Sequence, residues 1–256
     1  MMLSVITPSL NQASFLAGTI RSVLDQSTSF PFELIVVDGG STDGTVEILR
    51  QCTGNIRWIT ERDSGQSEAV NKGVEIAKGT IIGWLNSDDL YVPGALQKVM
   101  DQFILNPDRV WLLGNSMIVN ESGQEIRKAI TWYKNLKSKR FYPDHLLYEN
   151  FISQPSVFIR KDAFLQAGGL DTSLHYAMDY DLWLRLTRIS NPVVIYEPLS
   201  KFRIHKSSKS RKDHRALFRE QYRIHKRYDN RYGYLLLHQL HILAICAIYK
   251  LINPKT

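Results

Sequence analysis

The sequence has few cysteines, and they are not arranged as metal ligands. Only Cys52 and Cys246 occur among 256 residues, and no Cys-x-x-Cys pair is present. The sequence therefore does not favour a disulfide framework or a structural zinc site. It is typical of a protein from a reducing compartment. A chain of this length buries enough apolar surface to fold without cross-links.

Long apolar runs are also scarce. No signal-peptide pattern precedes Pro8, so we expect a cytoplasmic protein. The most apolar stretch, Leu235–Ile252, is too interrupted by His, Gln and Lys to favour a membrane span. It fits a helix lying on the inner face of an anionic membrane, or equally a helix that packs on the domain or on a second copy in a homodimer.

Positive charge is concentrated at one end of the chain. The net charge is +7, yet residues 201–231 alone hold 12 Lys and Arg against 3 Asp and Glu. The remainder carries a small net negative charge. A nucleic-acid-binding face within the main fold is therefore not expected, and the tail is suited to phosphates, anionic lipid or an acidic partner.

Glycine is missing where a dinucleotide-binding protein needs it. The turn after the first predicted strand, Pro8–Gln12, contains none. Close approach of a pyrophosphate to that turn requires glycine, so the sequence disfavours an NAD enzyme.

What the first hundred residues do contain is an alternation of short apolar runs and amphipathic stretches, typical of a doubly wound, mostly parallel α/β sheet. The predicted strands are Leu3–Thr7, Phe32–Val37, Ile56–Thr60 and Thr80–Leu85, and the predicted helices are Ser14–Gln26, Thr42–Cys52 with Ser41 or Thr42 as N-cap, and Ser67–Lys78.

The later part of the chain departs from this alternation. We expect a strand pair within Val110–Ile130, an irregular segment at Lys134–Asn150, a strand at Ser156–Arg160 and a helix at Asp179–Ile189. Residues 1–206 are predicted to form one catalytic domain, and residues 207–256 a basic and apolar helical tail.

Three acidic motifs stand where chemistry is expected, because ligands of such sheets bind at the carboxyl ends of strands. The first is Val37–Thr45, which delivers Asp38 from a strand into a glycine-rich turn before a helix. This arrangement can hold a nucleotide. It can equally be a tight strand-to-helix turn that Asp43 caps.

The second motif is Trp84–Asp89, in which an apolar strand ends in Asn86, Asp88 and Asp89. These are hard oxygen ligands suited to Mg²⁺ or Mn²⁺ carrying a diphosphate. Adjacent carboxylates at a buried strand end repel each other unless a cation is present. The alternative is a surface turn with capping aspartates.

The third motif, Met178–Leu186, opens a helix with Asp179 and Asp181. Two residues subtend about 200° on a helix, so one carboxylate can enter a site while the other pairs with Arg185 at i+4. Two acids that only complement the helix dipole are the alternative.

Together, in this order and spacing, the motifs resemble those of the family-2 glycosyltransferases of the GT-A fold. The resemblance covers residues 3–208. It rests on Ser4–Asn11, Val37–Thr45, Asp63–Gly73, Trp84–Asp89, Gln154–Phe158, Met178–Leu186 and Phe202–His205. It implies a Rossmann-like sheet flanked by helices, and inverting transfer of a sugar from a nucleotide diphosphate donor, expected to be a UDP-sugar, to an acceptor hydroxyl.

The resemblance also implies roles for individual residues. Asp179 would be the general base, and Asp88, Asp89 and His205 would bind Mn²⁺ or Mg²⁺. The nucleotide would be bound by Thr7, Pro8, Ser9, Asp38, Asp63, Asn71, Lys72, Ser87 and Asp88. The donor and acceptor sugars would contact Gln66, Asn86, Gln154, Tyr176 and Trp183.

Two positions depart from the family pattern. Asn86 stands where the family has the first acid of its DxD motif, and Met178 stands where it has the Glu before the catalytic Asp. We expect a metal site with one charge fewer and a base without its carboxylate neighbour. The acceptor is expected to be a saccharide or lipid-linked saccharide of bacterial-type glycan assembly.

Two other functional classes remain as alternatives. A sugar-phosphate nucleotidyltransferase also binds a metal nucleotide on an α/β sheet, but needs a glycine-rich basic loop after the first strand. A nucleic-acid-binding module would explain the basic tail, but not the acids. Activation of a sugar phosphate would identify the first, and steeply salt-dependent DNA or RNA binding the second.

Overall fold

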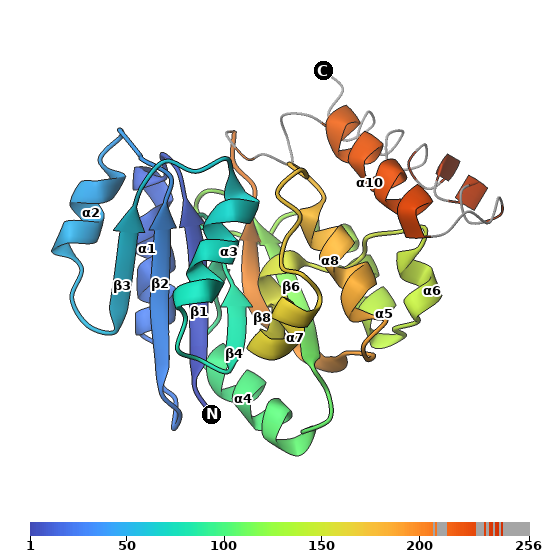
Figure 1. Cartoon of the computed structure of the whole chain (residues 1–256), viewed down its shortest axis with the longest axis horizontal. Helices are drawn as coiled ribbons and strands as arrows, with labels where there is room; N and C mark the ends of the chain where they lie inside the picture. The colour runs from blue at the N-terminus through green and yellow to red at the C-terminus, as the bar shows by residue number, and fades with distance from the viewer. Residues whose placement is uncertain are drawn as a thin grey trace.

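The computed structural model describes residues 1–206, 208 and 214–228, together with 233, 236, 237, 239, 240 and 242. One eight-stranded sheet crosses the molecule in the order β3-β2-β1-β4-β7-β6-β8-β5, and helices cover both of its faces (Figure 1). The architecture is α/β, as predicted.

The first half of the sheet is parallel. β1 pairs with β2 and β4, and β2 pairs with β3, all in parallel register. The elements are β1 (Leu3–Ser9), α1 (Ala13–Leu24), β2 (Phe32–Asp38), α2 (Thr45–Gln51), β3 (Ile56–Thr60), α3 (Gln66–Ile76) and β4 (Ile81–Trp84).

The second half is mixed. β7 runs antiparallel to both β4 and β6, and β8 runs parallel to β6 and antiparallel to β5. The elements are β5 (Leu90–Tyr91), α4 (Ala95–Leu105), β6 (Trp111–Val119), α5 (Lys128–Lys139), α6 (Pro143–Leu146), the 3₁₀ turn η1 (Gln154–Ser156), β7 (Val157–Arg160), α7 (Lys161–Gln166), α8 (Met178–Leu186), β8 (Val193–Arg203) and α10 (His214–Tyr228).

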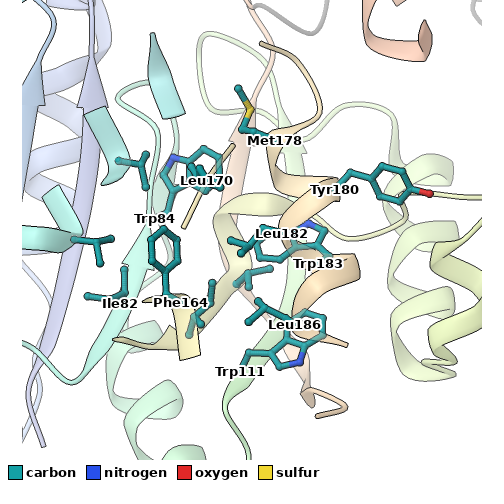
Figure 2. Close-up of a cluster of buried hydrophobic side chains, with 14 of the residues drawn as sticks. Ile82, Trp84, Trp111, Phe164, Leu170, Met178, Tyr180, Leu182, Trp183 and Leu186 are labelled. Carbon is teal, nitrogen blue, oxygen red and sulfur yellow. The ribbon is translucent and has the colours of Figure 1, made fainter. Parts of the chain in front are cut away.

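Alternation along the strands builds one core on each face. Ile35 and Val37 of β2 belong to the core under α3, α7 and α8, whereas Leu34 and Val36 belong to the core under α1 and α4. Figure 2 shows part of the first core, in which Trp111 of β6 lies among side chains of α8. Apolar residues on both faces of a strand are the pattern of a sheet covered on both sides.

Several sequence predictions need correction in the later half. Four of the seven strand pairings are parallel, as predicted for most of the sheet, but β7 runs antiparallel to both of its neighbours and β5 runs antiparallel to β8. No strand pair forms within Val110–Ile130: β6 is followed by a turn and one isolated bridge, and its ladder partners are β7 and β8. Lys134–Asn150 is not irregular, since it contains the second half of α5 and all of α6.

The start of α2 also differs from the prediction. Its N-cap is Gly44, in the left-handed conformation, rather than Ser41 or Thr42. The Ser41 hydroxyl is engaged by Asp38, and the Thr42 N–H donates to Asn11. Those groups hold the loop instead of capping the helix.

The described part of the tail lies against the domain. Ile224 of α10 is buried in the core under α8, and α10 runs beside α8 in Figure 1. The predicted helix at Leu235–Ile252 lies largely outside the described residues, and the domain boundary at 206 and 207 stays a prediction. Within the described residues, no helix combines the length and apolar character needed to cross a bilayer.

Candidate active site

A cavity of about 700 Å³ opens where β1 and β4 end. It extends between the loop after β3 and the first turn of α8, and α10 closes one side. Its wall contains ten residues predicted from the sequence to bind or act on a ligand: Pro8, Ser9, Asp63, Gln66, Asn86, Ser87, Asp88, Gln154, Tyr176 and Asp179.

At one end of the cavity Asp63 lies directly above Gly39. A Cβ atom at Gly39 would be 2.8 Å from an Asp63 carboxylate oxygen, so a larger residue there would push this carboxylate aside. Burial raises the pKa of Asp63 above its ordinary value, and the negative charges of Glu68 and Asp38 add to the effect. The Ser9 hydroxyl, also in the wall, is buried and has no hydrogen-bond partner within the described structure. This end of the cavity therefore contains a hydroxyl without a partner and a carboxylate that accepts one backbone N–H, from Gly65.

Asp38 lies behind this wall rather than in it. Its carboxylate is fully buried and accepts hydrogen bonds from the N–H groups of Gly40 and Ser41 and the hydroxyls of Ser41 and Thr60. Thr7 is likewise buried and outside the lining. Asp38, predicted to bind the nucleobase, and Thr7, predicted to bind the nucleotide, therefore both lie outside the cavity lining.

Asn86 is a hydrogen-bonded junction in the middle of the cavity wall. Its Oδ1 accepts from Gln66 Nε2 at 2.6 Å and from Trp84 Nε1 at 2.9 Å. Its Nδ2 donates to Gln154 Oε1 at 3.0 Å and to Asp89 Oδ2 at 3.3 Å. The amide uses both its acceptor and its donor capacity on protein groups, which a carboxylate could not do.

Asp88 and Asp89 have different environments. The Asp88 carboxylate is partly exposed to the cavity, and its Oδ2 lies 2.9 Å from Nε2 of His205. Asp89 is 1% exposed and accepts the Arg203 N–H. Burial, with the neighbouring charge of Asp88, raises the pKa of Asp89 well above its ordinary range. The structure therefore places Asp89, a predicted metal ligand, behind the wall and outside the cavity lining.

At the other end of the cavity, Asp179 stands in the first turn of α8. Its Oδ1 accepts the Tyr180 N–H at 2.7 Å, and its Oδ2 lies 3.5 Å from Asn150 Nδ2. The surrounding protein desolvates the carboxylate and raises its pKa, while the cation of Lys134, also in the wall, opposes this shift. A carboxylate with a raised pKa is suited to accept a proton.

Asp181 points away from the cavity, as the helical spacing predicts for one of the two acids. It is buried and binds Arg185, with Oδ2 2.7 Å from an Arg185 nitrogen, and it accepts the Tyr228 hydroxyl at 2.8 Å. Its role is to join α8 to α10.

Three predicted ligand contacts lie elsewhere. Lys72 forms ion pairs of 2.8 Å with Glu61 and Glu68 outside the cavity lining. The Asn71 side-chain amide donates to the Leu170 carbonyl and accepts the Leu170 N–H, and these two hydrogen bonds fix the loop after α7. Trp183 is buried and stacked on Trp111 (Figure 2), with ring centroids 6.0 Å apart, so it belongs to the core.

The structure also adds wall residues that the sequence analysis did not assign. Lys134 and Asn150 flank Asp179, and Arg203 lies near Asp89. Lys134 and Asn150 fell in a segment expected to be irregular, and Arg203 was part of a recognised motif without a role. Their placement depends on contacts between elements that are distant in the sequence, and Lys134 is one of four lysines of α5, so its residue type alone gave no signal.

Comparisons with known proteins identify the family and the fold. The sequence model of the family described as "Glycosyl transferase family 2" matches residues 4–166. An uncharacterized glycosyltransferase of Rickettsia typhi is 31% identical over 212 residues, which are 80% of this chain and 64% of the relative. The chain thus spans just under two thirds of that relative's length. A PGL/p-HBAD biosynthesis glycosyltransferase of Mycobacterium tuberculosis is 32% identical over 199 residues, 76% of this chain and 72% of the relative.

Solved structures show the same fold. S. aureus TarS 1–349 in complex with UDP-GlcNAc superposes with a TM-score of 0.67 and 19% identity, covering 88% of this chain and 65% of the TarS chain. At this identity the likeness concerns the fold alone, which is that of the GT-A glycosyltransferases. The match of the family model over most of the chain decides membership: this protein belongs to glycosyltransferase family 2.

Proposed function

We propose that this chain is a metal-dependent, inverting glycosyltransferase that moves a sugar from a nucleotide diphosphate donor, a UDP-sugar, to an acceptor hydroxyl. One observation carries the proposal: a single cavity contains Asp63, Asp88 and Asp179, supplied by three separate parts of the fold. Buried polar atoms in the same wall, Ser9 Oγ, Asn150 Oδ1 and Arg203 Nε, have no hydrogen-bond partner within the described residues. Such atoms need a ligand or water to satisfy them.

The end formed by Ser9 and Asp63 would receive the nucleoside. Ser9 is the last residue of β1 and Asp63 follows β3, so both lie at the carboxyl ends of parallel strands, where ligands of such sheets bind. The TarS structure with UDP-GlcNAc supports a uridine nucleotide as the first candidate, since it shares the fold. The identity of the sugar is left to experiment.

The residues present fit a metal that the donor diphosphate largely holds. Within the described residues, no three His, Cys, Asp or Glu side chains gather as a metal site. Asp88 and His205 offer one carboxylate and one imidazole, while the Asn86 oxygen is already used twice. Mg²⁺ commonly binds one or two carboxylates together with substrate phosphates. A bound Mn²⁺ or Mg²⁺ would stabilise negative charge on the leaving diphosphate.

Asp179 would act as the general base. An acceptor hydroxyl is a poor nucleophile at neutral pH, so Asp179 would remove its proton as the oxygen attacks the anomeric carbon. The bond to the diphosphate breaks on the opposite side, and a single displacement inverts the anomeric configuration. The proton is retained on the Asp179 carboxyl until solvent takes it.

Arg203 and Lys134 would contribute fixed positive charge. Arg203 lies in the wall with its guanidinium near Asp89 and stacked over Phe15, 5.0 Å from the ring centroid. Positive groups that are positioned before the reaction stabilise charge that develops in the transition state.

The acceptor would be a saccharide or lipid-linked saccharide in glycan assembly. Names of relatives support this class: an Escherichia coli chondroitin synthase is 25% identical over 191 residues, 73% of this chain and 27% of that protein. The basic segment 201–231 would favour contact with an anionic membrane surface, where such acceptors reside. A homodimer through the C-terminal segment is the alternative use of that region.

A thermal-shift panel of nucleoside diphosphates and nucleotide sugars, with and without Mn²⁺ or Mg²⁺, tests the proposal. A ligand that binds only the native state raises the melting temperature. We expect metal-dependent stabilisation by UDP and by one UDP-sugar, followed by UDP release when an acceptor is added. No stabilisation by any nucleotide under either condition would refute the donor assignment.

A further inference from the structure

The loop that leads into α8 is held by a side chain from another helix. α8 has no capping side chain of its own, because its N-cap residue is Ala177. Glu220 of α10 instead binds the three residues that come directly before the helix. Its Oε1 accepts the N–H of His175 at 2.9 Å, and its Oε2 accepts those of Tyr176 at 2.7 Å and Ala177 at 2.9 Å.

Three successive N–H groups on one carboxylate form an anion-binding concavity of the backbone. Glu220 is 9% exposed, so these charge-assisted bonds are largely shielded from water. Asp179 is only two residues after Ala177 in the sequence, and Tyr176 and Asp179 both line the cavity. The position of both side chains therefore depends on a loop that Glu220 holds.

α10 is itself firmly attached, so it can serve as a fixed point. The Tyr228 hydroxyl donates to Asp181, and Arg227 forms a 3.0 Å ion pair with Asp171. Ile224 is buried in the core, and His225 contacts the Leu147 carbonyl. Figure 1 shows α10 lying along α8. Because α10 is fixed to α8 and its neighbours in this way, the Glu220 carboxylate is held against the N–H groups of residues 175–177.

We infer that Glu220 is a positioning residue for the transfer reaction. Acting through the backbone of residues 175–177, it holds Asp179 at the distance and angle that proton removal requires, without touching substrate. The inference rests on the proposed function. It also assigns the first part of the C-terminal segment to the active site, since Leu217, Phe218 and Gln221 of the same helix line the cavity.

The experiment compares Glu220→Ala and Glu220→Gln with Arg223→Ala, an exposed position on the same helix. Glutamine keeps one acceptor oxygen but loses the charge and the second acceptor. We measure UDP release from UDP-glucose, UDP-galactose and UDP-GlcNAc with Mn²⁺, UDP affinity by calorimetry, and hydrogen exchange of the peptide that contains residues 175–177, all well below the melting temperature.

We expect kcat to fall about ten- to hundredfold in Glu220→Ala and less in Glu220→Gln, because small misplacements of a reacting group are costly. UDP affinity and the donor KM should stay within about twofold, and exchange at 175–177 should accelerate in the same order. Arg223→Ala should match the wild type in all three measurements.

The outcomes separate this inference from the proposed function. If the wild type releases UDP and Glu220→Ala retains its kcat, the positioning role is wrong while the function stands. If UDP affinity falls in parallel with kcat, Glu220 supports the fold generally, and the inference is also wrong. If the wild type releases UDP from none of the three donors, the exchange data decide whether Glu220 holds the loop, and the proposed function is judged separately by nucleotide binding in the thermal-shift panel.

Discussion

His205 Nε2 lies 2.9 Å from Asp88 Oδ2, although 117 residues separate the two in the chain. The contact exists because β5, which begins directly after Asp89, pairs with the last residues of β8, which ends just before His205. The ring of Phe15 packs on the His205 ring at 4.4 Å between centroids and limits its movement. A histidine so placed beside the cavity carboxylate is fixed before any ligand arrives.

Replacing this histidine should weaken metal-dependent nucleotide binding. His205→Ala removes the partner of Asp88 and one of the two groups proposed to hold the metal. We expect UDP affinity in Mn²⁺ to fall at least about tenfold, with little change without metal, as measured by calorimetry. Equal losses with and without Mn²⁺ would show that His205 acts only on the fold.

The two acids of α8 should respond differently to the same substitution. Asp179→Asn should reduce kcat by about 10²- to 10⁴-fold and leave UDP affinity unchanged, because a base is lost and the shape is kept. Asp181→Asn should instead lower stability by about 1–3 kcal/mol, since it leaves the buried partners of Asp181 poorly satisfied. Retained turnover in Asp179→Asn would contradict the assignment of the base.

The pH profile of kcat/KM should fall on its acidic side, and the charge of Lys134 should set the pH at which this fall occurs. Asp179 must be ionised to act as a base, so kcat/KM should rise as the pH rises through its raised pKa. In Lys134→Met the opposing cation is lost and the pKa of Asp179 rises further, which moves the limb to higher pH. Measured pH profiles of the two proteins check this. A limb that stays in place would exclude Asp179 as its source.

Restoring the acid that the family has at position 86 should harm this protein. In Asn86→Asp a carboxylate replaces the amide that donates to Asp89 and Gln154. The two carboxylates would repel each other, and both folded-state pKa values would be raised, so the loss of stability should be largest at neutral pH and shrink as the pH falls. We expect a loss of about 1–3 kcal/mol at pH 7 by denaturant unfolding. An undiminished or increased stability at pH 7 would contradict this account of Asn86.

Two helical glycines provide a matched test of packing. A Cβ at Gly73 of α3 would lie 2.3 Å from Ile6 Cγ2, whereas one at Gly18 of α1 would meet nothing closer than 3.9 Å. Gly73→Ala should therefore destabilise the fold by about 1–3 kcal/mol, and Gly18→Ala should stabilise it by about 0.5–1 kcal/mol. Denaturant unfolding of both variants measures the difference.

The sequence predicted the elements whose pattern is local. Ile6, Ile35 and Val37 alternate with residues of the opposite core, so the parallel strands could be located from periodicity. The reversed direction of β7 could not, because a short apolar strand carries no mark of its partner's orientation. α5 was missed for a related reason: it buries Thr131 and Ser138 and exposes Trp132, the opposite of the usual amphipathic pattern.

Within the site, residue types were predictable but their exposure was not. The motif at Trp84–Asp89 indicated clustered oxygen ligands, yet Asp88 faces the cavity and Asp89 is buried against the Arg203 backbone. The pairing of β5 with β8 places Asp89 against the Arg203 backbone and leaves Asp88 facing the cavity, and the motif itself does not show this pairing. Trp183 was expected beside a sugar by analogy, and the stacking of its ring on Trp111 shows that an aromatic motif residue can belong wholly to the core.

The pairing of β5 with β8 also sets the order in which the molecule can be completed. Leu90 is hydrogen-bonded in register with Lys201, a sequence separation of 111 residues. Contacts this distant form late, because a long loop must close before they contribute. A nascent chain can assemble the parallel strands around β1 while β5 still lacks its partner. The carboxylate of Asp88 meets its histidine only when about four fifths of the sequence has been synthesised, so this end of the cavity cannot form before β8 is made, and α10 closes the cavity later still.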